Sequence, residues 1–254
     1  MPRNLVIGDI HGMYGRLRSV LNHAHFNPQE DNLFALGDFC DRGPMPVRTL
    51  DYLMSLPRFY PVIGNHDIWL YEYLCTGIPA PIWLDPRNGG RKTYERLRRI
   101  NPENKERIRD WYGSFPLLRT IGDKIILHAG PSESIPTEEE LLTQAQSITL
   151  EQAYETKLRT GSYSPLVRDI VWDRDYIHTA MKLESESGPD RDPKILRDPF
   201  ATDKTIICGH TPLKEVFHSD AYHITCIDTG SFALEGHITV MDLDIGELFT
   251  SQGL

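Results

Sequence analysis

Three short apolar runs in the first 65 residues each end in a glycine followed by Asp or Asn. The runs and their endings occupy residues 5–9, 33–38 and 59–65. Their final polar residues, Asp9, Asp38 and Asn65, are 29 and 27 residues apart. Each step is close to one βαβ unit of roughly 30 residues. The spacing therefore predicts parallel strands whose carboxyl ends meet at one edge, where open α/β sheets bind ligands.

Helix and strand signals along the rest of the chain extend this pattern. Apolar residues at helical spacing predict helices over residues 14–25, 46–54, 67–75, 91–100 and 102–112. Later strands are expected at residues 117–121, 125–127, 205–208, 222–227, 238–243 and 248–251. We interpret the acidic run at residues 138–140 as solvated surface. We expect one α/β domain over residues 1–254, with a helical insertion at about 77–115 and a polar insertion at about 175–203.

The charge balance excludes some classes of partner. The chain has 27 Lys and Arg against 36 Asp and Glu, a formal net charge of −9, which argues against binding nucleic acid or an anionic membrane. No run approaches the roughly 18 apolar residues of a membrane span, and residues 1–7 carry no signal-peptide pattern. The four cysteines are scattered without a C-x-x-C pair. We therefore predict a cytoplasmic protein that binds neither nucleic acid nor membrane; its oligomeric state stays open.

Six polar residues follow apolar strand signals, and their chemical types suit metal binding. They are Asp9, His11, Asp38, Asn65, His128 and His210. Taken singly, an Asp at a strand end is usually a turn or cap residue, and a lone His is usually a core residue. Together, two carboxylates, three imidazoles and an amide would be costly to bury without cations. Two divalent metal ions would remove that cost; mixed oxygen and nitrogen donors suit Mn²⁺, Fe or Zn²⁺, and Asp38 lies centrally enough to bridge them.

Five sequence blocks occur in a fixed order across residues 8–212. They are Gly-Asp-Ile-His-Gly (8–12), Gly-Asp-Phe-Cys-Asp-Arg-Gly (37–43), Gly-Asn-His-Asp (64–67), His-Ala-Gly (128–130) and Gly-His-Thr-Pro (209–212). In these blocks the chain resembles the PPP-type, calcineurin-like metallophosphatases. Residues 88–90, 170–174 and 227–230 add a similarity to the small bacterial and phage serine/threonine protein phosphatases of the lambda phosphatase type. The resemblance implies the calcineurin-like metallophosphoesterase fold, a two-sheet β-sandwich flanked by helices.

The resemblance also assigns the metal ligands. It implies that Asp9, His11 and Asp38 hold one ion, and that Asp38, Asn65, His128 and His210 hold the other. Mn²⁺ is the expected metal, with Fe or Zn²⁺ as alternatives. A hydroxide bridging the two ions would attack phosphorus directly, so no protein nucleophile is required. His223 or His237 is the substitute ligand if His210 is not one.

The remaining site residues would act on the substrate. His66 would protonate the leaving oxygen, and Asp41 would orient it; the alternative for Asp41 is a helix cap ahead of Pro44. Arg42 and Arg174 would bind the phosphate in their planar forks, with Asn65 also facing it. The alternative for Arg174 is a surface salt bridge.

These assignments predict an enzyme that hydrolyses phosphate monoesters. The expected substrate is a phosphorylated protein, at phosphoserine or phosphothreonine and with breadth extending to phosphotyrosine, or a small phosphorylated molecule. The alternative is a symmetrical dinucleoside tetraphosphate hydrolase, for which Trp83, Tyr94 or Trp111 could stack on adenine or else belong to the core. A non-catalytic scaffold of the same fold is disfavoured because all six candidate ligands and His66 are present.

Overall fold

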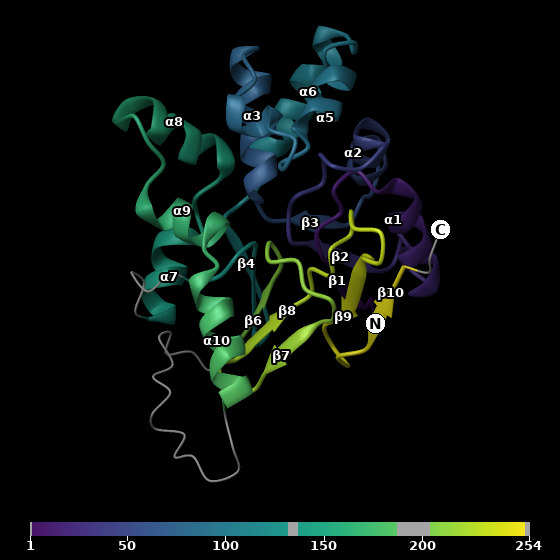
Figure 1. Cartoon of the computed structure of the whole chain (residues 1–254), viewed down its shortest axis with the longest axis vertical. Helices are drawn as coiled ribbons and strands as arrows, with labels where there is room; N and C mark the ends of the chain where they lie inside the picture. Colours follow the sequence, from purple (N-terminus) through teal and green to yellow (C-terminus); the bar gives the residue numbers. More distant parts are fainter. Residues whose placement is uncertain (1, 132–136, 187–203, 252–254) are drawn as a thin grey trace.

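The structure is a computed structural model that describes residues 2–131, 137–186 and 204–251, and its centre is a pair of five-stranded sheets (Figure 1). The strands are β1 (Asn4–Ile7), β2 (Asn32–Ala35), β3 (Phe59–Pro61), β4 (Leu118–Ile121), β5 (Lys124–Leu127), β6 (Thr205–Cys208), β7 (Phe217–Ser219), β8 (Ile224–Cys226), β9 (Thr239–Asp242) and β10 (Leu248–Thr250). The helices are α1 (Tyr14–His23), α2 (Pro46–Met54), α3 (Asn65–Thr76), α4 (Pro81–Leu84), α5 (Gly90–Leu97), α6 (Pro102–Gly113), α7 (Glu138–Ala145), α8 (Leu150–Thr160), α9 (Pro165–Trp172) and α10 (Asp175–Glu186).

Each sheet contains a parallel core of three strands. The first sheet has the order β10-β9-β1-β2-β3 and the second has the order β4-β5-β6-β8-β7. Strands β1, β2 and β3 run parallel, as do β5, β6 and β8. The register pairs Leu5 with Leu33 and Leu33 with Phe59, so the three predicted strand ends lie at the same edge. The predicted parallel arrangement and α/β fold class are confirmed.

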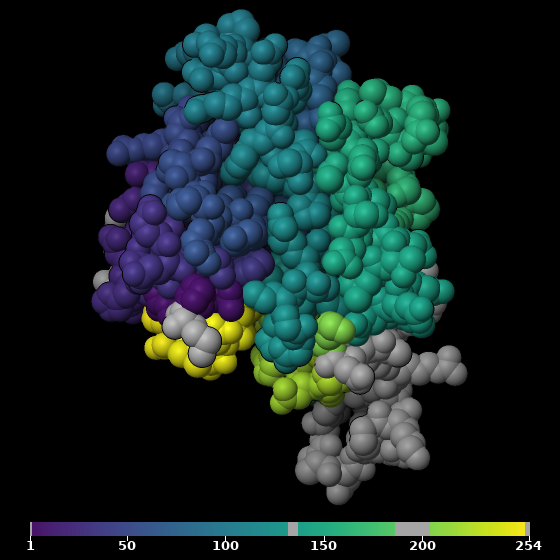
Figure 2. Space-filling model, turned by 180° about the vertical axis from the view of Figure 1, so that it is seen from behind, coloured from purple at the N-terminus to yellow at the C-terminus, as the bar shows by residue number. Residues whose placement is uncertain are grey.

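The two sheets pack face to face through a small apolar layer. Its buried members are Val6, Phe34, Leu36, Val62, Ile126, Ile207, Ile227 and Leu243, drawn from both sheets. Because side chains alternate along a strand, Leu5 and Ile7 point the other way and join the larger core under the helices. Seen from behind, the N-terminal part and the α7–α9 part lie on opposite sides of the β4–β5 region (Figure 2).

Helices α4, α5 and α6 fill most of the region predicted as a helical insertion, residues 77–115. The predicted polar insertion divides differently: residues 175–186 form α10, and residues 187–203 lie outside the described part of the chain. None of the helices in the described ranges is both long and apolar enough to cross a bilayer.

Helices α7 to α10 and strand β7 are absent from the sequence-based expectation. The acidic residues Glu138 to Glu140 form the first turn of α7, where Thr137 Oγ1 accepts the backbone N–H of Glu140. Carboxylates are favourable at that end of a helix, so the run is both surface and a helix start. Each of α7, α8 and α9 buries only two or three side chains, which is why the region looks polar.

Candidate active site

The carboxyl ends of the parallel strands bring six predicted ligands to one place between the two sheets. Asp9, His11 and Asp38 follow β1 and β2, Asn65 opens α3, and His128 and His210 follow β5 and β6. All six are buried, His210 being the most exposed at 7%. The structure thus joins residues up to 201 positions apart in sequence, through the bond from the His210 N–H to Asp9 Oδ1.

Left-handed backbone is concentrated at this site. Seven non-glycine residues of the described chain have positive φ, and five of them are predicted site residues: His11, Asp38, Asp41, Arg42 and His210. The left-handed conformation costs a non-glycine residue about 1–3 kcal/mol, and it persists only where the surrounding structure holds the residue in place. The site is also closely packed, because a Cβ at Gly209 would lie 2.3 Å from Asp9 Oδ1. The strain indicates a site whose geometry is held for function.

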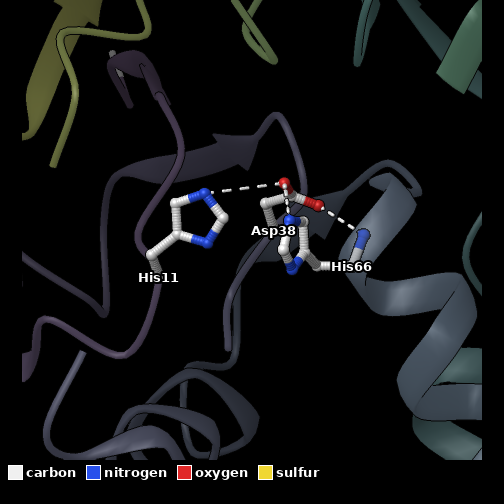
Figure 3. A group of neighbouring side chains, drawn as sticks. All are labelled: His11, Asp38 and His66. Atoms are coloured by element: carbon white, nitrogen blue, oxygen red, sulfur yellow. Dashed lines mark hydrogen bonds and ion pairs between the residues drawn. The ribbon is translucent and has the colours of Figure 1, made fainter. Parts of the chain in front are cut away.

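Asp38 is the centre of the cluster, as Figure 3 shows for its contacts with His11 and His66. Its Oδ2 lies 3.7 Å from His11 Nε2 and 3.9 Å from His66 Nε2. Its Oδ1 lies 3.7 Å from His128 Nε2 and accepts the His66 backbone N–H at 2.9 Å. The two carboxylate oxygens therefore face opposite halves of the site, which is the arrangement of a bridging ligand.

Backbone carbonyls fix the tautomers of three imidazoles. His11 Nδ1 and His128 Nδ1 donate to the carbonyls of Cys40 and Leu36, at 3.0 and 2.6 Å. His210 Nε2 donates to the carbonyl of Trp172 at 3.2 Å. The other nitrogen of each ring then carries a lone pair that points into the site, as in histidine ligands oriented by an outer carbonyl.

Asn65 Oδ1 gives the sharpest test of whether a cation fits. It lies 3.2 Å from His128 Nε2 and 3.0 Å from His210 Nδ1. By the tautomers above, both nitrogens are acceptors, so three lone-pair atoms converge with no proton between them. A divalent cation satisfies all three at once, and the donor set fits the predicted second ion.

The electrostatics point the same way. Burial raises the pKa of Asp9 well above its ordinary value, and the carboxylates of Asp228 and Asp38 raise it further. Burial likewise raises the pKa of Asp228 to about 6, with Asp38 adding to the rise. Burial alone would raise the pKa of Asp38, but the surrounding imidazoles, His66 first among them, lower it below its usual range. An ionised carboxylate crowded by other buried acids is what a cation stabilises.

Burial also lowers the pKa values of the candidate histidine ligands His11, His128 and His210. Neutral imidazole is the form that binds a metal. Two groups of donor atoms lie close enough to hold an ion, namely His11, Asp38 and His66, and Asp9, Asp38 and His128. Asp38 belongs to both groups. The described residues therefore fit two divalent ions, but they group His66 with His11 and Asp9 with His128, whereas the resemblance grouped Asp9 with His11.

Asp41 holds His66 and is itself held by Trp83. His66 Nδ1 and Trp83 Nε1 both donate to Asp41 Oδ2, at 2.6 and 2.7 Å. The Asp41 N–H donates to Thr93 Oγ1 at 3.0 Å. Asp41 therefore contacts the predicted general acid rather than a helix N-terminus.

Asp67 is a residue whose importance the sequence did not reveal. It is fully buried, and its carboxylate accepts the backbone N–H groups of Asp38, Phe39 and Gly64. These bonds tie the loop after β2 to the start of α3. In the sequence, Asp67 appears only as the last residue of the block at 64–67, with no role assigned to it.

A pocket of about 340 Å³ opens beside the cluster. Asp38, Asn65, His66 and His210 form its floor, and Arg42 and Arg174 form part of its wall. The Arg42 guanidinium contacts His11 Nε2. Arg174 donates to the backbone carbonyl of His210 at 3.3 Å, so its guanidinium is turned toward the site. The structure therefore places both predicted phosphate-binding arginines at one pocket.

The aromatic residues at the pocket are not the three that the sequence analysis weighed for stacking. Trp69 and Trp172 line it. Trp83 is buried beneath Asp41, whereas Trp111 stacks on Phe59 and Tyr94 packs against Tyr73. Among the described residues, neither His223 nor His237 belongs to a group of donor atoms close enough to hold an ion, whereas His210 contacts Asn65. Of the two alternatives for Trp83, Tyr94 and Trp111, membership of the core is therefore confirmed.

Comparison with known proteins agrees with this geometry. The profile of the calcineurin-like phosphoesterases matches residues 2–225. Symmetrical bis(5'-nucleosyl)-tetraphosphatases from Aromatoleum aromaticum and Methylococcus capsulatus are each 25% identical, over 80% and 94% of this chain and 81% and 90% of their own length. A protein serine/threonine phosphatase from Saccharomyces cerevisiae shares the fold, with a TM-score of 0.59 at 16% identity over 100% of this chain and 80% of that one. These sequence relatives are not lambda-type phosphatases, so the subgroup expected above stays a prediction.

Proposed function

Because the chain belongs to the calcineurin-like phosphoesterase family, we propose that it is a metal-dependent hydrolase of symmetrical dinucleoside tetraphosphates. Water adds across the central phosphoanhydride, the P–O–P bond breaks, and two nucleoside diphosphates form. The observation that carries the proposal is the composition of the pocket, in which Trp69 and Trp172 stand beside Arg42 and Arg174. Indole rings stack on bases, and guanidinium forks bind phosphate.

The sequence relatives support this choice over a phosphoprotein substrate. Those named above are called symmetrical bis(5'-nucleosyl)-tetraphosphatases, and they match over 80% and 94% of this chain. The proposal therefore takes the alternative of the sequence analysis as its main hypothesis.

We assign the metal ligands as in the sequence analysis, and Mn²⁺ is our first choice of ion. The ligands are Asp9, His11, Asp38, Asn65, His128 and His210. When bound, two such ions supply Lewis acidity toward the phosphate and lower the pKa of the attacking water. Arg42 and Arg174 orient the phosphate and balance the charge that develops on it. His66 gives its proton to the departing oxygen. Asp41, bonded to His66 Nδ1, keeps Nε2 directed at the pocket.

A phosphate monoesterase, acting on phosphoproteins or small phosphates, is the second candidate. The sequence Gly209-His210-Thr211-Pro212 favours it, because the symmetrical tetraphosphatases usually carry Gly-His-Trp at this point. Thr211 is buried directly after the ligand His210, so the difference lies close to the reacting centre.

The test is phosphate and nucleotide release in Mn²⁺ buffer from three substrates side by side: diadenosine tetraphosphate, a phosphoserine peptide and p-nitrophenyl phosphate. Release of ADP alone from the dinucleotide, faster than phosphate release from the peptide, is the expected result. Hydrolysis of the peptide with no ADP formation would overturn the proposal in favour of the second candidate.

A further inference from the structure

A second hollow adjoins the active-site pocket on the other side of Arg42. Its volume is about 420 Å³, and its lining includes Arg42, Arg87, Arg91, Lys92, Glu95 and Phe232. Arg42 lines both spaces, so a ligand passing along its guanidinium would touch both. The first pocket, at about 340 Å³, is at the low end of the roughly 300–1,000 Å³ range of ligand sites. A symmetrical dinucleoside tetraphosphate has two nucleoside diphosphate halves, and the two adjoining spaces offer one for each.

The second hollow is cationic in an acidic chain. The formal net charge is −9, yet the lining contains four cationic side chains against the single carboxylate of Glu95. Arg87 pairs with Asp85 at 3.0 Å, and Lys92 Nζ donates to the backbone carbonyl of Arg42 at 3.3 Å. Arg91 and Lys92 are exposed on the first turn of α5. Their positions suit an anion that continues outward from Arg42.

Phe232 supplies an aromatic wall to the same hollow. The Arg42 guanidinium carbon lies 4.3 Å from the centroid of the Phe232 ring, which is 38% exposed. The loop that bears Phe232 is fixed, because the Arg16 guanidinium on α1 donates to the carbonyls of Ser231, Ala233 and Leu234. A preformed aromatic surface loses little entropy when a base stacks on it.

We propose that this second hollow binds the nucleoside diphosphate half of the substrate that does not occupy the first pocket. Arg91 and Lys92 contact its phosphates, and Phe232 stacks on its base. The inference rests on the proposed function, since a small phosphate monoester has no such half. It makes Arg91, Lys92 and Phe232 specificity residues for the dinucleotide.

The experiment compares kcat/KM for diadenosine tetraphosphate with kcat/KM for p-nitrophenyl phosphate. In Phe232→Leu, and in the double variant Arg91→Ala with Lys92→Ala, we expect the ratio of the two values to fall at least tenfold. Phe232→Tyr should retain the ratio, because it keeps the ring. Arg99→Ala, which removes an exposed cation just beyond α5, is the matched charge control and should leave both values unchanged.

A variant that only disturbs Arg42 would lower both kcat/KM values together and leave their ratio unchanged. The ratio therefore reports on the second hollow and not on Arg42. A ratio within twofold of wild type in both test variants would overturn the inference while leaving the proposed function intact. Wild-type protein that hydrolyses p-nitrophenyl phosphate but not the dinucleotide would overturn both.

Discussion

The indole of Trp83 donates its only hydrogen bond to Asp41 Oδ2, at 2.7 Å, and so completes a chain from the helical region to His66. Trp83 is fully buried, and Gly90 lies against it so closely that a Cβ there would come within 2.3 Å of Nε1. The helical region therefore orients the proposed general acid as well as covering the sheet.

Replacing Trp83 by Phe tests this link. The ring remains, but a buried carboxylate oxygen loses one of its two donors, which costs about 1–3 kcal/mol. We expect that loss in urea unfolding, together with a fall in kcat of about 10–100-fold, the range for groups that orient a site through a neighbour. Trp111→Phe is the matched control, because Trp111 only packs against other rings. Equal effects of the two changes on kcat would contradict an orienting role.

His66→Asn should remove the proton donor while leaving the six predicted metal ligands in place. We expect kcat to fall by about 10²–10⁴-fold, the usual contribution of general acid catalysis. In a series of aryl phosphates, the variant should also depend more steeply on the pKa of the leaving group than wild type does. His178→Asn, at an exposed histidine of α10, serves as the control. A variant with an unaltered leaving-group dependence would show that His66 does not protonate the leaving oxygen.

Asp67→Asn should destabilise the loop between β2 and α3. The carboxylate accepts three backbone N–H groups, and an amide nitrogen in place of one oxygen would leave at least one of them buried and unpaired. We expect a loss of about 2–4 kcal/mol in the free energy of unfolding, since each such group costs about 1–3 kcal/mol. For comparison, Asp51→Asn breaks an exposed pair with Arg107 at 3.6 Å and should cost at most about 1 kcal/mol. Equal losses would mean that these buried bonds contribute no more than a surface ion pair.

Two substitutions at Asn65 test the metal-ligand assignment. Asn65→Asp keeps an oxygen facing His128 and His210, so Mn²⁺ binding measured by calorimetric titration should persist or tighten. Asn65→Leu removes that oxygen and should weaken binding at one of two sites by at least about tenfold, which is about 1.4 kcal/mol. Asn22→Leu, on the exposed face of α1, controls for the loss of an amide. If Asn65→Leu still bound two ions with wild-type affinity, Asn65 would not be a ligand.

The site was more predictable than the fold around it, and the reason is local. Asp9, Asp38 and Asn65 each follow a purely apolar run with a glycine between, so strand, turn and polar residue are visible in a few consecutive letters. Helices α7 to α10 bury few side chains each, so their periodicity is weak. Strand β7, three residues long, is too short to show alternation.

Trp83 and Asp67 illustrate what the sequence could not supply. An aromatic residue at helical spacing is typical of a core, and Trp83 is indeed buried; its bond to Asp41, 42 residues away, depends on how α4 packs on the loop after β2. Asp67 looks like an ordinary first-turn acid of α3. Asp67 becomes a partner of Asp38 only because the loop after β2 packs against the first turn of α3.

The hydrogen bond from the His210 N–H to Asp9 Oδ1 joins residues 201 positions apart. It can therefore form only after His210 has been synthesised. At roughly 5–20 residues per second on the ribosome, Asp9 emerges roughly 10–40 seconds before His210 can meet it. Throughout that interval the N-terminal ligands have no complete partner set. With His210 as a proposed ligand, the second ion site is complete only after residue 210 has been synthesised. A chain truncated before His210 should therefore bind that ion weakly, however much metal is supplied.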